Sequence, residues 1–399
     1  MKRKPADAPT LFPPPPACPP VAPVPIADPK RGARLREADR GQLAWGPVDL
    51  DAMLGQDHPA RAILAVVGRL DLDALYQPIR ARDEMAGAPA IDPKVLLALW
   101  VHATSEGEAS AREIWRLTQM HTAYRWLCGG VAVGYHTLSD FRSQRMGVCD
   151  ELITQVLALL MSQDLIDLYR VAQDGTRIRA SAGAASFRGE QTLGTLMAQA
   201  RAHLEAVTRE AEDPEVSARR AAARRRGAAE RLARLEAALA QIPEVAQTRR
   251  RSGAKDATPR VSTTDPDARV MKMGDGGFRP AYNIQFATTA DPARVIVGVE
   301  VTNRGSDMGQ TTPMLEQIQR RTGCRPTEIL VDGGYPSHEA IDQAAQGGTT
   351  FYAPVPTPRT PDSPDPHAPR DADSAPVAAW RKRMATEEAK QIYRQRGGV

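Results

Sequence analysis

Apolar side chains recur at helical spacing through residues 43–165. Ile63, Val67 and Leu70, for example, fall three and four residues apart on one face of such a helix. This spacing is typical of amphipathic helices that pack on one another. The sequence therefore predicts a helical domain over residues 43–165.

A strictly alternating pattern appears at residues 281–303. The two sides of a strand there would carry Tyr282, Ile284 and Phe286 and, opposite them, Asn283, Gln285 and Ala287. After an Asp-Pro turn the chain returns with alternating valines. Alternation on both sides of a turn predicts an antiparallel hairpin.

Two further short strands each end close to a carboxylate. The first leads to Asp174, where a glycine would allow a tight turn, and the second leads to Asp332. Helices are predicted at 307–321 and 337–346, and a last strand at 349–355. With the hairpin, this order predicts a five-stranded mixed sheet of the ribonuclease-H type. The predicted fold class is α/β (α+β), with a helical N-terminal domain followed by this sheet domain.

Two helical stripes interrupt the sheet domain between residues 188 and 255. Leu193 and Leu204 belong to the first stripe and Leu235 and Ile242 to the second, which predicts an antiparallel helical pair. The basic run near the tip of this pair comprises Arg219, Arg220, Arg224, Arg225 and Arg226.

Segments rich in proline mark the parts of the chain that we expect to lack order. They are residues 1–42 and residues 356–379. The predicted organisation is a disordered tail 1–42, a helical domain 43–165, a sheet domain 166–355 with its helical insertion 188–255, a linker 356–379, and the start of a last helix in 380–399.

The formal net charge of +4 hides an uneven distribution. Residues 1–42 carry +4 and residues 219–260 carry +8, which leaves −8 for the rest of the chain. Clustered positive charge favours a polyanionic partner, because contacts to phosphates release counterions. A solvated helix face is the alternative for any single arginine run.

Composition excludes several classes of protein. No apolar run approaches the roughly 18–20 residues of a membrane span, and proline-rich sequence follows the basic start where a signal peptide needs an apolar stretch. The four cysteines have no CxxC spacing, which argues against a zinc site and a disulfide scaffold. The expected compartment is a reducing cytoplasm.

Short helices joined by glycine turns at residues 110–146 resemble a helix-turn-helix. On the last of these helices Ser139, Arg142 and Arg145 share one side, as residues that read a DNA groove do. The helical domain is therefore a candidate DNA-binding domain. A surface helix with ordinary polar residues is the alternative.

Asp174 and Asp332 are distant in sequence, yet neighbouring strands would bring them to one edge of the sheet. Two like charges there repel unless a divalent cation joins them. Oxygen ligands with open coordination positions suit Mg²⁺ or Mn²⁺. Two such ions about 4 Å apart activate water or a 3′-hydroxyl at a phosphodiester. Taken singly, each Asp-Gly pair is also a common turn former.

Several motifs, in this order, resemble those of bacterial insertion-sequence transposases of the DDE, ribonuclease-H-like class. They are Gly134–Arg142, Asp174–Ala180, Asp265–Arg269 with Tyr282–Gln285, and Val331–Tyr335. The resemblance implies that Asp174 and Asp332 are the first two catalytic, metal-binding carboxylates. It also implies a homo-oligomer in the bacterial cytoplasm and nucleoid that acts on double-stranded DNA, namely terminal inverted repeats and target DNA.

The resemblance further implies a third carboxylate, a Glu, on the last helix. Tyr393 and Arg396 match the residues that precede this Glu and would lie beside the DNA backbone, but the chain stops one residue before it. We therefore expect a transposase that is truncated at its C-terminus and impaired in cleavage. The alternatives are a non-catalytic DNA-binding regulator of transposition and, for the segment 190–250, a dimerisation arm with merely solvated arginines.

Overall fold

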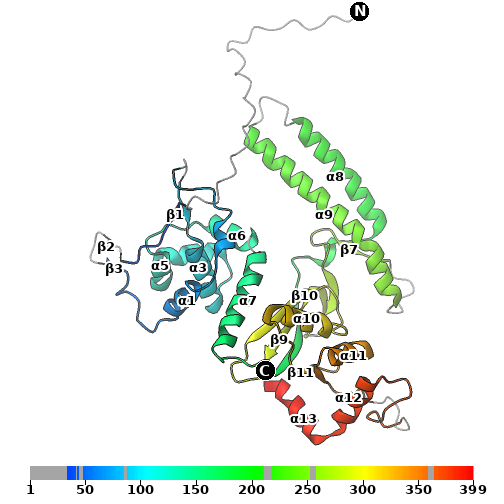
Figure 1. Ribbon diagram of the computed structural model, residues 1–399. Helices are drawn as coiled ribbons and strands as arrows, with labels where there is room; N and C mark the ends of the chain where they lie inside the picture. The colour runs from blue at the N-terminus through cyan, green and yellow to red at the C-terminus, as the bar shows by residue number, and fades with distance from the viewer. Residues whose placement is uncertain are drawn as a thin grey trace, which may run out of the picture. The chain divides into compact units, whose positions relative to one another are not determined.

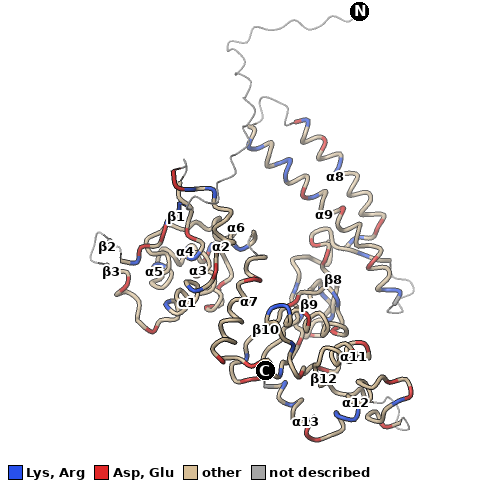
Figure 2. The backbone as a smooth tube through the Cα atoms, in the orientation of Figure 1, with Lys and Arg blue, Asp and Glu red and all other residues tan. Residues whose placement is uncertain are grey.

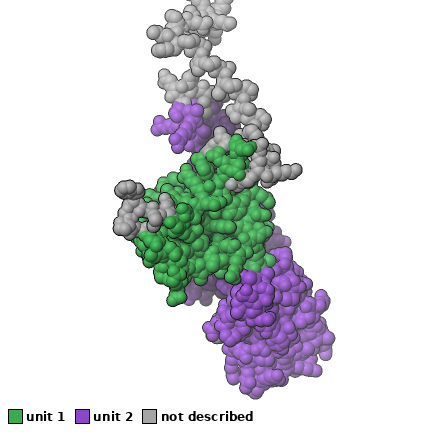
Figure 3. Space-filling view, turned by 60° about the vertical axis from the view of Figure 1, so that its left-hand side comes forward, with its two compact units in different colours: residues 1–156 green, residues 157–399 purple. Residues whose placement is uncertain are grey.

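The chain divides into two compact units, residues 1–156 and 157–399 (Figure 3). The computed structural model describes residues 34–41, 43–44, 48–84, 88–144, 146–210, 217–251, 258–357 and 364–398. None of the helices in these ranges is both long and apolar enough to cross a membrane.

The first unit is helical, as the apolar spacing predicts (Figure 1). Its helices are α1 (Pro59–Val67), α2 (Asp73–Tyr76), α3 (Pro93–Ser105), α4 (Ala111–Met120), α5 (Thr122–Cys128), α6 (Tyr135–Gln144) and the start of α7 (Met146–Ser162). Its short strands are β1 (Leu35–Arg36), β2 (Leu43–Ala44), β3 (Val48–Asp49) and β4 (Ala90–Ile91).

The core of the first unit forms where these short helices meet. Leu99 of α3, Ile114 of α4 and Leu138 of α6 are fully buried in one cluster. Helix α3 begins at Pro93, because the Asp92 side chain accepts from the backbone N–H of Lys94 and a proline needs no partner at the first helical position. Packing of this kind positions the exposed face of α6.

Residues 34–41, which belong to the tail predicted to be disordered, are ordered in the structure. Leu35 pairs with Ala90 in a parallel β1–β4 contact, and the Arg40 guanidinium donates to the Leu127 carbonyl at 3.3 Å. These contacts give residues 34–41 a defined structure against the helical unit, so the prediction of disorder is wrong for them. The rest of the 1–42 prediction lies outside the described residues.

The second unit is built on a mixed sheet with the strand order β10-β9-β5-β11-β12, and β8 also pairs with β9. Strand β5 runs parallel to β11, and β11 runs parallel to β12, whereas β9 is antiparallel to both β5 and β10. This is the mixed sheet expected from the sequence. The bounds are β5 (Arg170–Arg179), β8 (Arg269–Lys272), β9 (Phe278–Thr289), β10 (Ile296–Thr302), β11 (Glu328–Leu330) and β12 (Thr350–Tyr352).

Helices cover the sheet through apolar contacts. Met314 and Ile318 of α10 (Thr311–Thr322) pack in one cluster with Ala287 and Val297 of the hairpin. Helix α11 (His338–Gln346), capped by Ser337 as predicted, and α12 (Ala375–Ala385) pack with β11 and β12. The chain ends in α13 (Glu387–Arg394) and a 3₁₀ turn at Gln395–Gly398.

The predicted helical pair lies between β6 (Phe187–Arg188) and β7 (Val261–Ser262). Helix α8 (Glu190–Glu210) packs along α9 (Ala218–Arg251), and Leu193, Leu235 and Ile242 are buried between them. These side chains come from the two apolar stripes. The hydrophobic faces of the two helices are thus used against each other.

Most of the predicted linker 356–379 is ordered. Asp373 and Arg381 form an ion pair at 2.7 Å with side chains only 1% and 6% exposed, and Arg381 also donates to the Pro366 carbonyl. The prediction of disorder is wrong for residues 364–379, because these polar residues satisfy a buried arginine on α12. Residues 358–363 lie outside the described part.

Candidate functional site

Asp174 and Asp332 lie side by side on adjacent parallel strands. Ala172 of β5 pairs with Leu330 of β11, and each aspartate stands two residues further along its strand or strand end. Asp174 lies within β5 and Asp332 follows the end of β11, and both carboxylates lie within 3.9 Å of one guanidinium nitrogen. We call these two residues the carboxylate pair.

Arg396 joins the carboxylate pair. Its Nη2 lies 2.9 Å from Asp174 Oδ2 and 3.9 Å from Asp332 Oδ2. The guanidinium is held there because α13 packs on the sheet through Tyr393 and Gln395 accepts a hydrogen bond from Arg170 of β5. The predicted site residues at the two strand ends and at the C-terminus therefore meet in one place.

A cavity of about 490 Å³ opens beside Asp174. Its walls are Ala172, Gln173, Asp174, Gly175, Thr176, Phe286, Thr288, Ile296 and Arg396. The cavity lies along β5 and β9, so an extended ligand on this side of the sheet would pass the Asp174 carboxylate.

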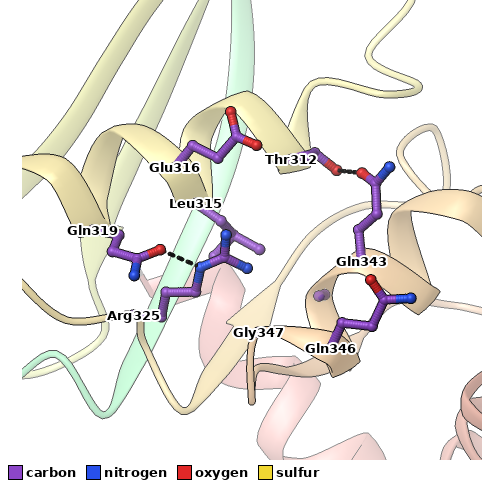
Figure 4. Close-up of a pocket in the computed structure, with 9 residues that line it drawn as sticks. Thr312, Leu315, Glu316, Gln319, Arg325, Gln343, Gln346 and Gly347 are labelled. Carbon is purple, nitrogen blue, oxygen red and sulfur yellow. Dashed lines mark hydrogen bonds between the residues drawn. The ribbon is translucent and has the colours of Figure 1, made fainter.

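A somewhat larger cavity, about 580 Å³, lies between α10 and α11 (Figure 4). Across it Thr312 Oγ1 donates to Gln343 Oε1 at 2.7 Å, and on one side Arg325 Nε donates to Gln319 Oε1 at 2.7 Å. None of the site residues predicted from the sequence belongs to the walls of this cavity. Because these polar groups already form hydrogen bonds with one another, we take the cavity beside Asp174 as the better candidate for the functional site.

The carboxylate pair fits a hard divalent cation in donor type and in charge. Both side chains are anionic oxygen donors, and a cationic group already bridges them. Across the described ranges, however, no group of three or more His, Cys, Asp or Glu side chains lies close enough to enclose a metal ion. The pair would therefore hold a cation from one side and leave positions open.

Sequence reasoning missed a polar network beneath the carboxylate pair. Tyr335 donates to Gln285 Oε1 at 2.5 Å, and Asn283 and Gln285 both donate to Asp307 Oδ1. Burial and the charges of Asp307, Asp174 and Asp332 raise the pKa of the Tyr335 hydroxyl, which therefore stays protonated. The sequence did contain a signal for this network, because Asn283 and Gln285 place two polar side chains on the same side of the predicted strand.

Asp307 lies away from its predicted place at a helix start. Helix α10 begins at Thr311, and the Asp307 carboxylate points instead to the amides of β9. Two neutral amide donors and Arg177, whose Nη2 is 3.8 Å away, compensate its charge. The predicted helix therefore begins at Thr311 and not at Asp307.

The helix-turn-helix residues occupy the surface of α6. Ser139 is half-buried and Arg142 is exposed, while Arg145 lies outside the described residues. The Arg142 guanidinium stacks on the Trp100 ring at 4.6 Å and donates to the Ala109 carbonyl at 2.7 Å. These contacts hold Arg142 against its own unit.

Basic residues are frequent along the N-terminal part of α9, where the tube of Figure 2 is repeatedly blue. Arg224 pairs with Glu210 across the tip of the helical pair at 2.9 Å, and both side chains are more than half exposed. The predicted basic run is exposed throughout and comprises Arg219, Arg220, Arg224, Arg225 and Arg226. A solvent-facing arginine cluster near a hairpin tip is accessible to a polyanion.

Two transposase families match the chain. The transposase domain family DUF772 matches residues 48–144, and the transposase DDE domain matches residues 250–399. The second match contains Asp332, whereas Asp174 and the α8–α9 pair, except for the last two residues of α9, lie between the two matched segments. No curated protein and no solved structure matches the chain. The two matches agree with each other and together cover more than half of the chain, which therefore belongs to the insertion-sequence transposases with a DDE domain.

Proposed function

We propose that this chain cleaves and joins DNA at transposon ends, with the carboxylate pair as its metal-binding centre. The observation that carries the proposal is that Asp174 and Asp332 stand side by side on parallel strands, bridged by a cation from the protein itself. Two neighbouring carboxylates bridged by a positive group are the arrangement that a divalent cation would take over.

The residues of the chain have separate roles in this proposal. Asp174 and Asp332 hold Mg²⁺ or Mn²⁺, and the cavity along β5 and β9 positions the phosphodiester next to them. When bound, the ions activate the attacking oxygen and stabilise the leaving oxygen. Arg396 must release the carboxylates as they bind the cation, and its guanidinium then faces the DNA phosphates, for which its fork geometry is suited.

Double-stranded DNA is the proposed partner of both units. The exposed side of α6 would contact the terminal inverted repeats, and the arginines at the tip of the α8–α9 pair would contact phosphates of the ends or of the target. Since the apolar faces of α8 and α9 pack on each other, assembly into a homo-oligomer on DNA would use the outer faces of this arm.

Cleavage of a cognate terminal inverted repeat in Mn²⁺ tests the proposal. We expect only low-level cleavage by the unaltered chain, because Asp174 and Asp332 are two of the three carboxylates that the family resemblance implies, and we expect that cleavage to be lost in Asp174→Ala and Asp332→Ala. Asp275→Ala is the matched control, because Asp275 is an exposed carboxylate that pairs with Arg279. Robust cleavage by Asp174→Ala would refute the assignment.

A second candidate function is DNA binding without catalysis, as in a regulator that occupies transposon ends. It is favoured by the Arg396 bridge, which occupies the carboxylate pair and offsets one of its two negative charges, while the arginines of α9 are exposed. A gel-shift series in Mn²⁺ distinguishes the two functions, since a regulator binds the repeats in a salt-dependent way and gives no cleavage.

A further inference from the structure

The polar side of strand β9 is its buried side. Asn283 and Gln285 are 1% and 0% exposed, whereas the apolar Tyr282, Ile284 and Phe286 are only half-buried. Gln173 of the neighbouring strand β5 is also 0% exposed. Burying amides is unfavourable unless hydrogen bonds compensate for the lost water. A partner for these amides is therefore a requirement of the fold.

Asp307 is that partner. From the loop between β10 and α10, its Oδ1 accepts from Asn283 Nδ2 at 2.7 Å and from Gln285 Nε2 at 2.8 Å. Hydrogen bonds to a charged acceptor are stronger than those to a neutral one. The carboxylate is thus fixed by two buried donors and is itself only 20% exposed.

The same network reaches the turn that carries Asp332. Gln285 Oε1 accepts from the buried Tyr335 hydroxyl, three residues after Asp332. A Cβ placed on Gly334 would stand 3.1 Å from Asp332 Oδ1 and 3.8 Å from Asp307 Oδ2. Asp307 therefore borders the Asp332 turn directly and also through Gln285 and Tyr335.

The network also lies against the backbone next to Asp174. A Cβ placed on Gly175 would stand 2.3 Å from Gln285 Nε2 and 2.8 Å from Asp307 Oδ1. In addition, the buried Asn283 Oδ1 has no hydrogen-bond partner among the described residues and would stand 2.9 Å from the same Cβ. The group of Asp307, Asn283 and Gln285 is therefore in contact with both segments that carry the carboxylate pair.

We infer that Asp307 is a positioning residue for the carboxylate pair, acting through Gln285 and Tyr335 on the Asp332 turn and through Gly175 on Asp174. This inference rests on the proposed function, since it assigns Asp307 to the same metal centre. We assign Asp307 a supporting role rather than that of a ligand, because its Oδ1 already accepts hydrogen bonds from Asn283 and Gln285. It sets the spacing of the two ligands and adds negative charge beneath them.

Mn²⁺ affinity of the full chain, measured by electron paramagnetic resonance of the free ion, tests the inference without relying on activity. Asp307→Asn keeps the size of the side chain and removes its charge, and we expect it to weaken Mn²⁺ binding about tenfold, as changes in the residues that support metal ligands do. Tyr335→Phe removes the link to Gln285 and should also weaken binding. Asp275→Asn is the matched control and should bind as the unaltered chain does.

Thermal unfolding of each variant in EDTA identifies a temperature at which all of them are folded, and the Mn²⁺ affinities are compared at that temperature. If Asp307 has a purely structural role, substituting it leaves the Mn²⁺ affinity of the folded protein unchanged. Weaker binding in both Asp307→Asn and Tyr335→Phe, with the Asp275→Asn control unaffected, supports the inference. Wild-type affinity in Asp307→Asn, together with loss of binding in Asp174→Asn, overturns it and leaves the proposed function standing. Absence of Mn²⁺ binding by the unaltered chain overturns both.

Discussion

Gly175 is required by close packing rather than by a turn. Strand β5 continues through it to Arg179, and its backbone φ is not in the left-handed region, yet a Cβ would stand 2.3 Å from a hydrogen-bonded, buried amide. The Asp-Gly sequence thus reflects a network pressed against the strand. A side chain at this position has to displace part of that network.

We predict that Gly175→Ala destabilises the second unit by about 1–3 kcal/mol, since overpacking forces buried neighbours to move. Chemical denaturation followed by circular dichroism measures this. Gly183→Ala is the control, because a Cβ there meets nothing within 4 Å. An unchanged midpoint for Gly175→Ala would show that the network is loose.

Arg396 competes with any cation for the carboxylate pair. Removing it should therefore strengthen Mn²⁺ binding about two- to fivefold, in line with the roughly 0.5–1 kcal/mol of a partly exposed ion pair. Mn²⁺ titration of Arg396→Ala checks this, with Arg394→Ala, an exposed arginine of the same segment, as the control. Weaker binding in Arg396→Ala would mean that the guanidinium organises the site instead.

At the scale of elements, alternation and helical spacing were sufficient to predict the β9–β10 hairpin, the α8–α9 pair and the strand that leads to Asp332. They could not predict which side of β9 is buried. The usual rule places Ile284 and Phe286 inside, but the loop that carries Asp307 folds back on Asn283 and Gln285. That choice depends on a contact between distant segments and is invisible to local pattern.

The same limit explains the errors at Leu35 and Asp373. Proline-rich composition is a local signal, whereas a strand partner such as Ala90, or a buried ion pair with Arg381, comes from elsewhere in the chain. Polar segments of this kind become ordered when a packed element needs their donors or acceptors. The ion pair between Arg396 and Asp174 could not be predicted either, because it also joins distant parts of the chain.

The arginines at the tip of the α8–α9 pair belong to the element scale, because their effect depends on position along the helix. Arg225→Gln with Arg226→Gln should reduce the slope of log affinity against log salt by up to about 2, since each phosphate that an arginine neutralises adds about 0.9 to that slope. The matched control is Arg231→Gln with Arg234→Gln, two exposed arginines further along α9. Equal slopes for all three proteins would indicate a solvated helix face.

At the scale of the whole molecule, our proposal assigns DNA binding to α6 and to the arginines of α9, and the chemistry to the carboxylate pair. The helical unit carries α6, and the sheet unit carries the carboxylate pair and the arginines of α9. We therefore predict that Asp174→Asn and Asp332→Asn bind terminal repeats within about twofold of the unaltered chain, since these substitutions leave the proposed DNA-contacting residues of α6 and α9 unchanged. Gel-shift measurements check this, and a large drop in DNA affinity would contradict the division.

The central claim is that Asp174 and Asp332 bind the same divalent cation. The most direct test is a double-mutant cycle of Mn²⁺ affinity with Asp174→Asn, Asp332→Asn and the double variant. If one ion bridges both carboxylates, each single change weakens binding at least about tenfold and the double change adds little. Effects that multiply independently, or a single variant that binds Mn²⁺ as the unaltered chain does, would contradict the claim.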